Sequence, residues 1–145
     1  MILFTSSGRT SEPPILWRFF DYADAGWNID DWYGSLTEDE RDVFDALLKT
    51  NAKAETPQDW NGCKMLQGEA KEEKIWEWRF HPSGRQQRIL GIFGENRREA
   101  IFLIGCNHKQ EVYDPPKCIP TAIKRAKDVR AKKVKLNARQ IEPNI

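Results

Sequence analysis

A histidine and a lysine stand next to each other just after the apolar run of residues 100–106. His108, with an unperturbed pKa of about 6.5, is suited to general acid or base catalysis. Lys109 can offset negative charge that develops on a phosphate group. Together the two residues favour phosphoryl chemistry. The other interpretation is that they form the solvated end of a strand.

Two arginines precede this pair. Arg88 is the first candidate for binding a phosphate, because a guanidinium presents a planar fork of donors to two oxygens. The alternative for Arg88 is a cross-strand ion pair with Glu77 or Glu99. Arg79 alternates with tryptophans along its segment, so we predict that it lines an open cleft and binds substrate, or else is structural.

Charge is distributed unevenly along the chain. Residues 1–70 contain 6 Lys/Arg and 13 Asp/Glu, whereas residues 71–145 contain 17 Lys/Arg and 9 Asp/Glu. A basic half of this kind indicates contact with nucleic acid, with Lys124 and Arg125 as predicted substrate-binding residues. The alternative is that the two oppositely charged halves pack together.

A metal site is a possible use of the cysteines and histidines, but their spacing does not favour one. Cys106-x-His108 with Cys63 or His81 could form a zinc site, yet no paired ligand spacing is present. The sequence also contains no phosphate-binding glycine loop. We therefore expect no metal and no cofactor.

The composition indicates a cytoplasmic protein without a membrane partner. No apolar run approaches the roughly 20 residues that a membrane-spanning helix needs. Residues 2–4 are too few for the apolar region of a signal peptide. The three cysteines, an odd number at unrelated spacings, are expected to be reduced thiols.

The first half predicts one strand and one helix within a single domain of residues 1–145. Residues 1–14 are expected to form a loose arm and residues 134–145 a loose tail. The apolar run 15–20 predicts a buried strand, followed by an irregular connection over 21–34. Thr37 and Glu40 form a predicted capping box that starts a helix ending near residues 49–52. Residues 55–73 are expected to be a short helix or turn and then a loop.

The second half predicts three strands and a basic helix. Apolar residues alternate from residue 74 onward, which predicts strands over 76–80, 88–93 and 100–106, with the third strand central. Short turns make these strands an antiparallel meander. A helix over 120–133 has one apolar face. The predicted fold is an α+β domain, in which the N-terminal strand and the meander form an antiparallel sheet packed with N-terminal helices and a C-terminal helix.

Four segments resemble the RelE/ParE superfamily of bacterial toxins, most closely its HigB-like, phage-derived branch. They are Pro57-x-x-Trp60-x-x-x-Lys64-x-Leu66-x-Gly68; Ile75-Trp76-Glu77-Trp78-Arg79-Phe80; Gly84-x-x-x-Arg88-Ile89-Leu90; and Ile104-Gly105-x-x-His108-Lys109, with Tyr113-x-Pro115-Pro116 and the helix containing Ala122 to Arg125. The resemblance covers residues 36–133 and implies a RelE-like fold.

What the resemblance implies is a toxin of a type II toxin–antitoxin system that acts as a metal-independent, ribosome-dependent mRNA endonuclease. Such enzymes align the ribose 2′-OH with the scissile phosphate, stabilise charge on the phosphate oxygens and protonate the leaving 5′-oxygen. The implied catalytic residues are Arg88, His108, Lys109 and Tyr113. Tyr113 matches a tyrosine that stacks on or acts near the cleaved nucleotide, or it is structural. The implied partners are mRNA on the ribosome and a cognate helix-turn-helix antitoxin.

The chain departs from the family pattern at two places. RelE-type toxins have two lysines on the strand that here reads Trp76 and Trp78, and an arginine near the position of Asn107. These departures leave open a catalytically inactive, phage-derived RNA- or protein-binding remnant of the same fold. A gyrase-poisoning toxin of the ParE branch is a third hypothesis, although residues 76–80 and the His108-Lys109 pair favour the HigB side.

Overall fold

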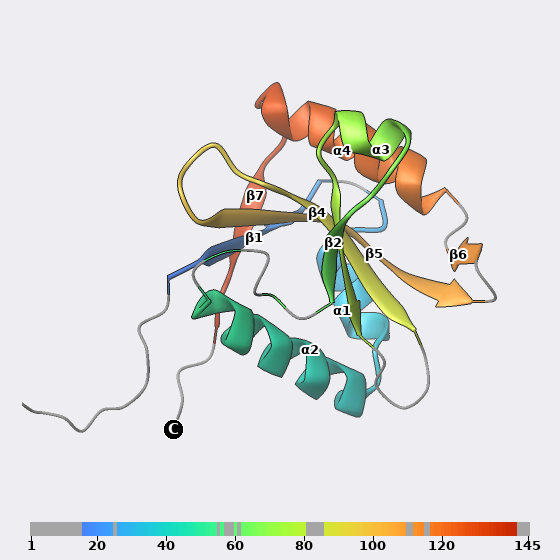
Figure 1. Ribbon diagram of the computed structural model, residues 1–145. Coiled ribbons are helices and arrows are strands. Elements are labelled where there is room, and N and C mark those ends of the chain that lie inside the picture. Colours follow the sequence, from blue (N-terminus) through green and yellow to red (C-terminus); the bar gives the residue numbers. More distant parts are fainter. Residues whose placement is uncertain are drawn as a thin grey trace, which may run out of the picture.

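A seven-stranded sheet forms the middle layer of the protein, with helices on both of its faces (Figure 1). The computed structural model describes residues 16–24, 26–54, 56, 60, 62–80, 86–109, 112–114 and 117–141, with the backbone alone for 108–109 and 112–114. The predicted α+β class is confirmed. The arm predicted over 1–14 lies outside the described residues.

The strands differ in length, and the longest lies inside the sheet. They are β1 (Arg18–Tyr22), β2 (Cys63–Met65), β3 (Trp76–Phe80), β4 (Gln87–Phe93), β5 (Glu99–Lys109), β6 (Val112–Asp114) and β7 (Leu136–Arg139). Their order is β2-β3-β4-β5-β1-β7, and β6 also pairs with β5. The central position of β5 agrees with its sequence, because Ile101 to Ile104 are apolar on both strand faces.

The sheet is mixed, so the prediction of a fully antiparallel sheet is wrong. β3, β4 and β5 pair antiparallel in chain order, but β1 pairs parallel with β5. The chain between β1 and β2 folds into helices instead of a tight turn, which leaves β1 free to enter the sheet beside β5 in the parallel direction. The alternation of apolar residues within a strand contains no information about this direction.

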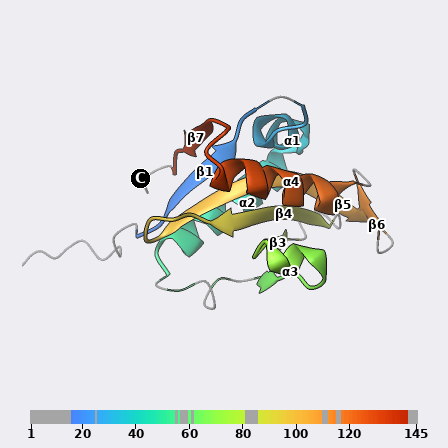
Figure 2. The ribbon, with the colours of Figure 1, turned by 90° about the horizontal axis from the view of Figure 1, so that it is seen from above.

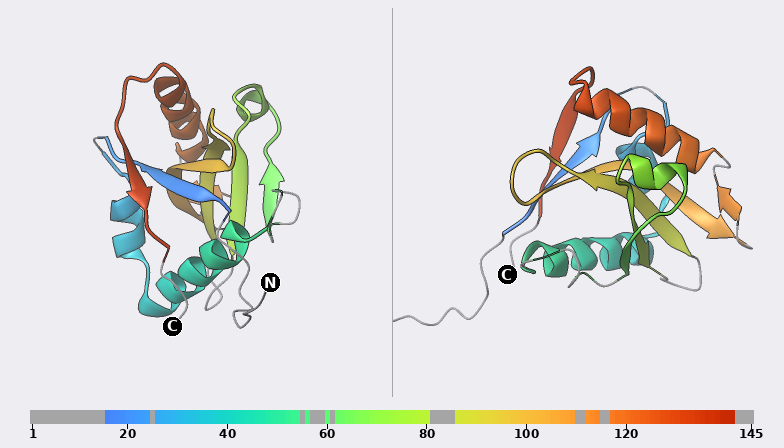
Figure 3. Two further views of the ribbon diagram at one scale, coloured as in Figure 1. Left: turned by 90° about the vertical axis from the view of Figure 1, so that its left-hand side faces the viewer. Right: turned by 45° about the horizontal axis from the view of Figure 1, so that its top comes forward.

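Helices α1 (Ile29–Ser35) and α2 (Glu38–Ala52) cover one face of the sheet, and α3 (Glu69–Glu72) and α4 (Cys118–Arg130) cover the other (Figure 3). The first face is aromatic, because Trp32 of α1 and Phe44 of α2 pack on Phe102 of β5 and its neighbours. The second face is aliphatic, because α4 packs on Leu90 and Leu103. Figure 2 shows α4 lying over the sheet.

Two capping boxes begin the helices of the aromatic face. The predicted box at Thr37 and Glu40 is confirmed, and α2 ends at Ala52 as expected. Helix α1 occupies part of the region predicted to be irregular, and the side chain of its N-cap, Asn28, accepts from the backbone N–H of Asp31. Helix α4 runs from Cys118 to Arg130, two residues before the predicted start and three before the predicted end.

Strand β7 corrects the expectation of a loose C-terminal tail. Leu136–Arg139 pair antiparallel with β1, which makes β7 an edge of the sheet. The loop predicted within residues 55–73 likewise contains strand β2 and helix α3. Strands β2 and β7 are short, so neither contains the several alternating apolar and polar residues from which a strand is predicted.

Candidate functional site

Four of the predicted site residues occupy positions on one face of the sheet, because of the strand register. Arg79 of β3 pairs with Arg88 of β4, and Arg88 pairs with Cys106 of β5. His108 stands two residues beyond Cys106 and pairs with Tyr113 of β6. Directly paired residues share a face, as do residues two apart along a strand. The face is the one that α4 covers further along, since Cys106 packs there with Cys118.

The register also corrects the expected position of His108 and Lys109. The sequence predicted a strand ending at residue 106, with both residues just beyond it, whereas both belong to β5. Their strand continues because β6 pairs with its last three residues and Lys109 is the partner of Val112. Among the described residues, β6 is the strand that pairs with His108 and Lys109, and it does so on one side. Because the two residues are consecutive, they belong to opposite faces of β5.

Arg88 is buried in the cross-strand ion pair that was its alternative interpretation. Its Nη1 donates to Glu77 Oε1 at 2.9 Å, and its Nη2 donates to Gln86 Oε1 at 2.9 Å. Both Arg88 and Glu77 are buried. Direct contact of Arg88 with a phosphate stays a prediction, and in the free protein a carboxylate occupies part of its donor fork.

Arg79 and Lys64 approach the same carboxylate from the neighbouring positions. Arg79 Nε lies 3.7 Å and Lys64 Nζ 3.9 Å from Glu77 Oε1. Lys64 of β2 is the register partner of Glu77, so the three basic side chains gather around one acid. Sequence reasoning missed Lys64. Its position between Cys63 and Met65 was a usable signal, because one polar residue between two apolar ones fits a strand.

Arg125 and Lys124 are not equivalent, although both were predicted to bind substrate. Arg125 is buried and its Nη1 donates to the backbone oxygens of Trp27 at 2.7 Å and Leu103 at 2.9 Å. Its Cζ lies 4.5 Å from the ring centre of Tyr22. Burial lowers the pKa of Arg125. The guanidinium therefore joins α4 to β5 and to the segment before α1, and substrate binding by Arg125 stays a prediction.

Lys124 lies on the exposed side of α4. Its Nζ donates to Asp128 Oδ2 at 2.9 Å, one helical turn further along. The hydrogen bond to Asp128 raises the pKa of Lys124. Lys124 is thus accessible to a polyanion, with its charge partly compensated by its neighbour.

The thiols near the site are neutral and closely packed. The hydrogen bond with Cys118, together with burial, raises the pKa of the Cys106 thiol. Burial raises the pKa of Cys63 to about 12. In the parts of the chain that the structure describes, no three His, Cys, Asp or Glu side chains gather closely enough to hold a metal ion. His81, one of the ligands considered for zinc, lies outside them.

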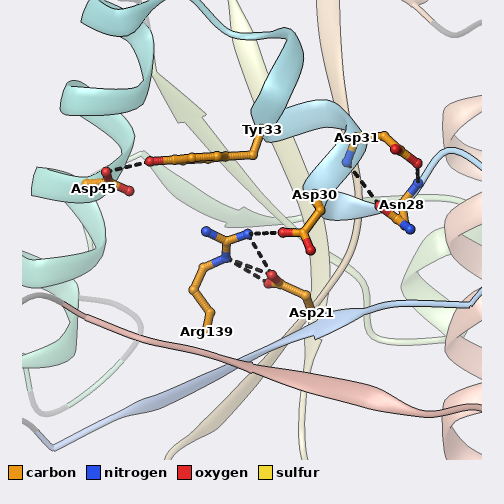
Figure 4. A network of polar contacts seen from close by, with 7 residues as sticks. All are labelled: Asp21, Asn28, Asp30, Asp31, Tyr33, Asp45 and Arg139. Atoms are coloured by element: carbon orange, nitrogen blue, oxygen red, sulfur yellow. Dashed lines mark hydrogen bonds and ion pairs between the residues drawn. The ribbon is translucent and has the colours of Figure 1, made fainter.

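A second polar cluster surrounds Arg139 of β7 at the other side of the sheet (Figure 4). Arg139 Nε donates to both oxygens of Asp21, at 3.0 and 2.8 Å, and its Nη2 donates to Asp30 at 3.2 Å. Its Cζ lies 4.9 Å from the ring centre of Tyr33. Although burial opposes the charge, the hydrogen bond to Asp21 raises the pKa of Arg139.

A cavity of about 670 Å³ opens beside this second cluster. Its charged lining comprises Asp21, Asp30, Asp42, Asp45, Lys49 and Arg139. Acids outnumber bases in this lining, so the cavity repels a polyanion. We therefore place the candidate nucleic-acid site on the face that contains Arg79 and Arg88.

No family model, curated protein or solved structure matches the chain. None of the helices among the described residues is both long and apolar enough to span a membrane.

Proposed function

We propose that the protein is a toxin of the RelE/HigB type, a metal-independent endoribonuclease that cleaves mRNA on the ribosome. The observation that supports this most is the strand register, which places Arg79, Arg88, His108 and Tyr113 on one face of the sheet. A nuclease without a metal needs cations and proton-transfer groups around one phosphate, and these residue types provide both.

The proposed roles follow from the chemistry of each side chain. His108 transfers a proton. Arg79 stabilises the charge that develops on the phosphate, because Lys109 directly follows His108 along β5 and so belongs to the opposite strand face. Tyr113, the register partner of His108, stacks on an unpaired base. Lys124 on the exposed side of α4 extends the basic surface for the RNA strand. The proposed second partner is a helix-turn-helix antitoxin that neutralises the toxin.

Induced expression in a bacterial culture tests this function directly. We expect growth arrest, and primer extension on translated messages should show new 5′ ends. His108→Ala and Tyr113→Ala should each lower cleavage by about 10²-fold or more while remaining folded, as expected for residues that transfer protons or position the nucleotide. The control Lys132→Ala, which removes an exposed cation outside this face of the sheet, should cleave like the wild type. Normal growth with intact transcripts would contradict the proposal.

A non-catalytic RNA-binding protein of the same fold is the second candidate. The observation that favours it is the internal use of two guanidinium groups, since Arg88 bonds Glu77 and Arg125 bonds backbone oxygens. Under this hypothesis the purified protein binds RNA, and ribosome-bound mRNA stays intact at every protein concentration. A neighbouring gene for a helix-turn-helix protein would favour the toxin instead.

A further inference from the structure

Two arginines face each other across neighbouring strands. Arg79 of β3 is the direct register partner of Arg88 of β4. Like charges in directly opposed positions destabilise a sheet unless a counter-charge lies between them. Glu77 supplies that counter-charge, with its Oε1 2.9 Å from Arg88 Nη1 and 3.7 Å from Arg79 Nε.

A third cation exceeds what this carboxylate can neutralise. Lys64 is paired with Glu77 from the other side, and its Nζ lies 3.9 Å from the same oxygen. One carboxylate thus faces three positive side chains, which leaves a local surplus of two charges within this group. A surplus of positive charge on a partly desolvated surface attracts an anion.

Burial divides the four side chains into an inner and an outer pair. The side chains of Glu77 and Arg88 are 1% and 8% exposed, whereas those of Lys64 and Arg79 are 52% and 39% exposed. Arg88 is held by hydrogen bonds to Glu77 and Gln86. Lys64 and Arg79 lie beyond hydrogen-bond distance of the carboxylate, which attracts them without using their donors.

We propose that Lys64 and Arg79 form a binding site for one phosphodiester group of an RNA strand, and that the buried Glu77–Arg88 pair positions them. The choice of RNA as the source of the phosphate rests on the proposed function, since the cluster shares its sheet face with the positions of His108 and Tyr113. The guanidinium of Arg79 offers paired donors to two phosphate oxygens, and the ammonium of Lys64 adds a point charge. Arg88 is then a positioning residue.

The phosphate site is tested with a short, fluorescein-labelled 2′-O-methyl RNA, which a nuclease acting through the 2′-OH cannot cleave. Binding to the full chain is measured by fluorescence anisotropy over a series of salt concentrations. Lys64→Gln and Arg79→Gln should each weaken binding by about tenfold, because each removes a charge-assisted contact. Each should also reduce the slope of log K against log salt by about 0.7.

Matched controls separate this site from general loss of positive charge. Lys132 lies 3.9 Å from Glu95, the same distance as Lys64 from Glu77, and Arg18 forms an exposed pair with Glu99. Lys132→Gln and Arg18→Gln should keep the wild-type affinity and salt slope. Equal losses in the controls and in the cluster variants would overturn the proposal, as would equally tight binding of poly-L-glutamate.

Glu77→Gln tests positioning against simple charge attraction. It removes the only carboxylate of this four-residue group, so attraction alone predicts tighter RNA binding, whereas loss of positioning predicts weaker binding. If circular dichroism shows that Glu77→Gln does not fold, Arg88→Lys takes its place, because it keeps the charge and loses the paired geometry. Unchanged or tighter binding by the folded variant would overturn the positioning role.

The outcomes for this site and for the proposed function are separable. If the two cluster variants lose RNA binding while the wild-type protein leaves mRNA intact, the phosphate site stands and the nuclease fails. If the wild-type protein cleaves mRNA and both variants bind and cleave equally well, the nuclease stands and the phosphate site is overturned.

Discussion

Two clusters of charged side chains lie at different places on the sheet. One has more acidic than basic side chains, and the other has more basic than acidic ones. Around Arg139, one guanidinium contacts two carboxylates, Asp21 and Asp30. Around Glu77, one carboxylate attracts three cations. The first cluster joins β7 to β1 and α1, so its bonds hold parts of the fold together. The second lies on β2, β3 and β4, and within the described part of the chain its ion pairs join no helix to them. Its surplus charge is positive and half-exposed, so it is available to an anionic ligand.

This difference explains why only one of the two clusters is a candidate RNA site. Acids outnumber bases among the charged residues that line the cavity beside Arg139, and the Arg139 guanidinium already donates to Asp21. The outer side chains beside Glu77 are basic and half-exposed. In this protein both clusters contain a buried ion pair, so the sign of the surplus charge is what separates them.

The largest expected effect comes from breaking the inner pair of the basic cluster. Glu77→Leu leaves the buried Arg88 without its carboxylate and should lower the free energy of unfolding by about 3–5 kcal/mol. The double variant Glu77→Leu/Arg88→Met removes both charges and should recover most of that loss. Urea unfolding gives the free energy of unfolding of the wild type, the single variant and the double variant. A double variant as unstable as the single one would contradict the account of a buried pair.

A smaller loss is expected in the acidic cluster. Arg139→Met leaves the buried Asp21 without its paired donor, and we expect a loss of about 2–3 kcal/mol in unfolding free energy. Hydrogen exchange should accelerate first in β7 and β1. Asp30→Asn is the control, because Asp30 is largely exposed and should contribute less than about 1 kcal/mol. Equal effects of the two substitutions would contradict the assignment of Asp21 as the main partner.

The smallest effect concerns the phenol that lies over Arg139. Tyr33 Oη donates to Asp45 Oδ2 at 2.7 Å, so Tyr33→Phe should cost about 0.5–1.5 kcal/mol near neutral pH. Burial and then this hydrogen bond raise the pKa of Tyr33 from 10.0 to about 12.

The high-pH behaviour of the same variant gives a second measurement. The folded protein holds the phenol proton more tightly than the unfolded chain, so this contribution is complete below pH 10 and is lost between pH 10 and 12. The stability difference between wild type and Tyr33→Phe should therefore shrink over that range. A constant difference from pH 8 to 12 would show that the phenol titrates normally in the folded protein.

Local signals predicted the elements whose sequence pattern is long or chemically specific. The capping residues Thr37 and Glu40 were sufficient to begin α2, because the box depends only on residues three apart. Strand β3 followed from the alternation of Trp76, Trp78 and Phe80. Helix α1 was missed because its seven residues are too few to repeat an apolar spacing, although its capping residues were visible in the sequence.

The sequence predicted which residues belong to the candidate site better than it predicted which residues they contact. Glu77 was already an alternative partner of Arg88, because both stand on adjacent predicted strands. The burial of Arg125 was missed because its charge suggested solvent. Its spacing of three residues from Ala122 placed it near the apolar face of α4, and this was an available signal.

The sequence by itself determined the α+β class, the main strands and the basic character of the second half, because these depend on periodicity and composition. Only the tertiary structure decided the parallel pairing of β1, the entry of β7 into the sheet and the gathering of Lys64, Arg79 and Arg88 around one carboxylate. These features depend on which distant strands become neighbours. Which strands become neighbours depends on how the helices pack on the two faces of the whole sheet, and a local sequence pattern does not predict this.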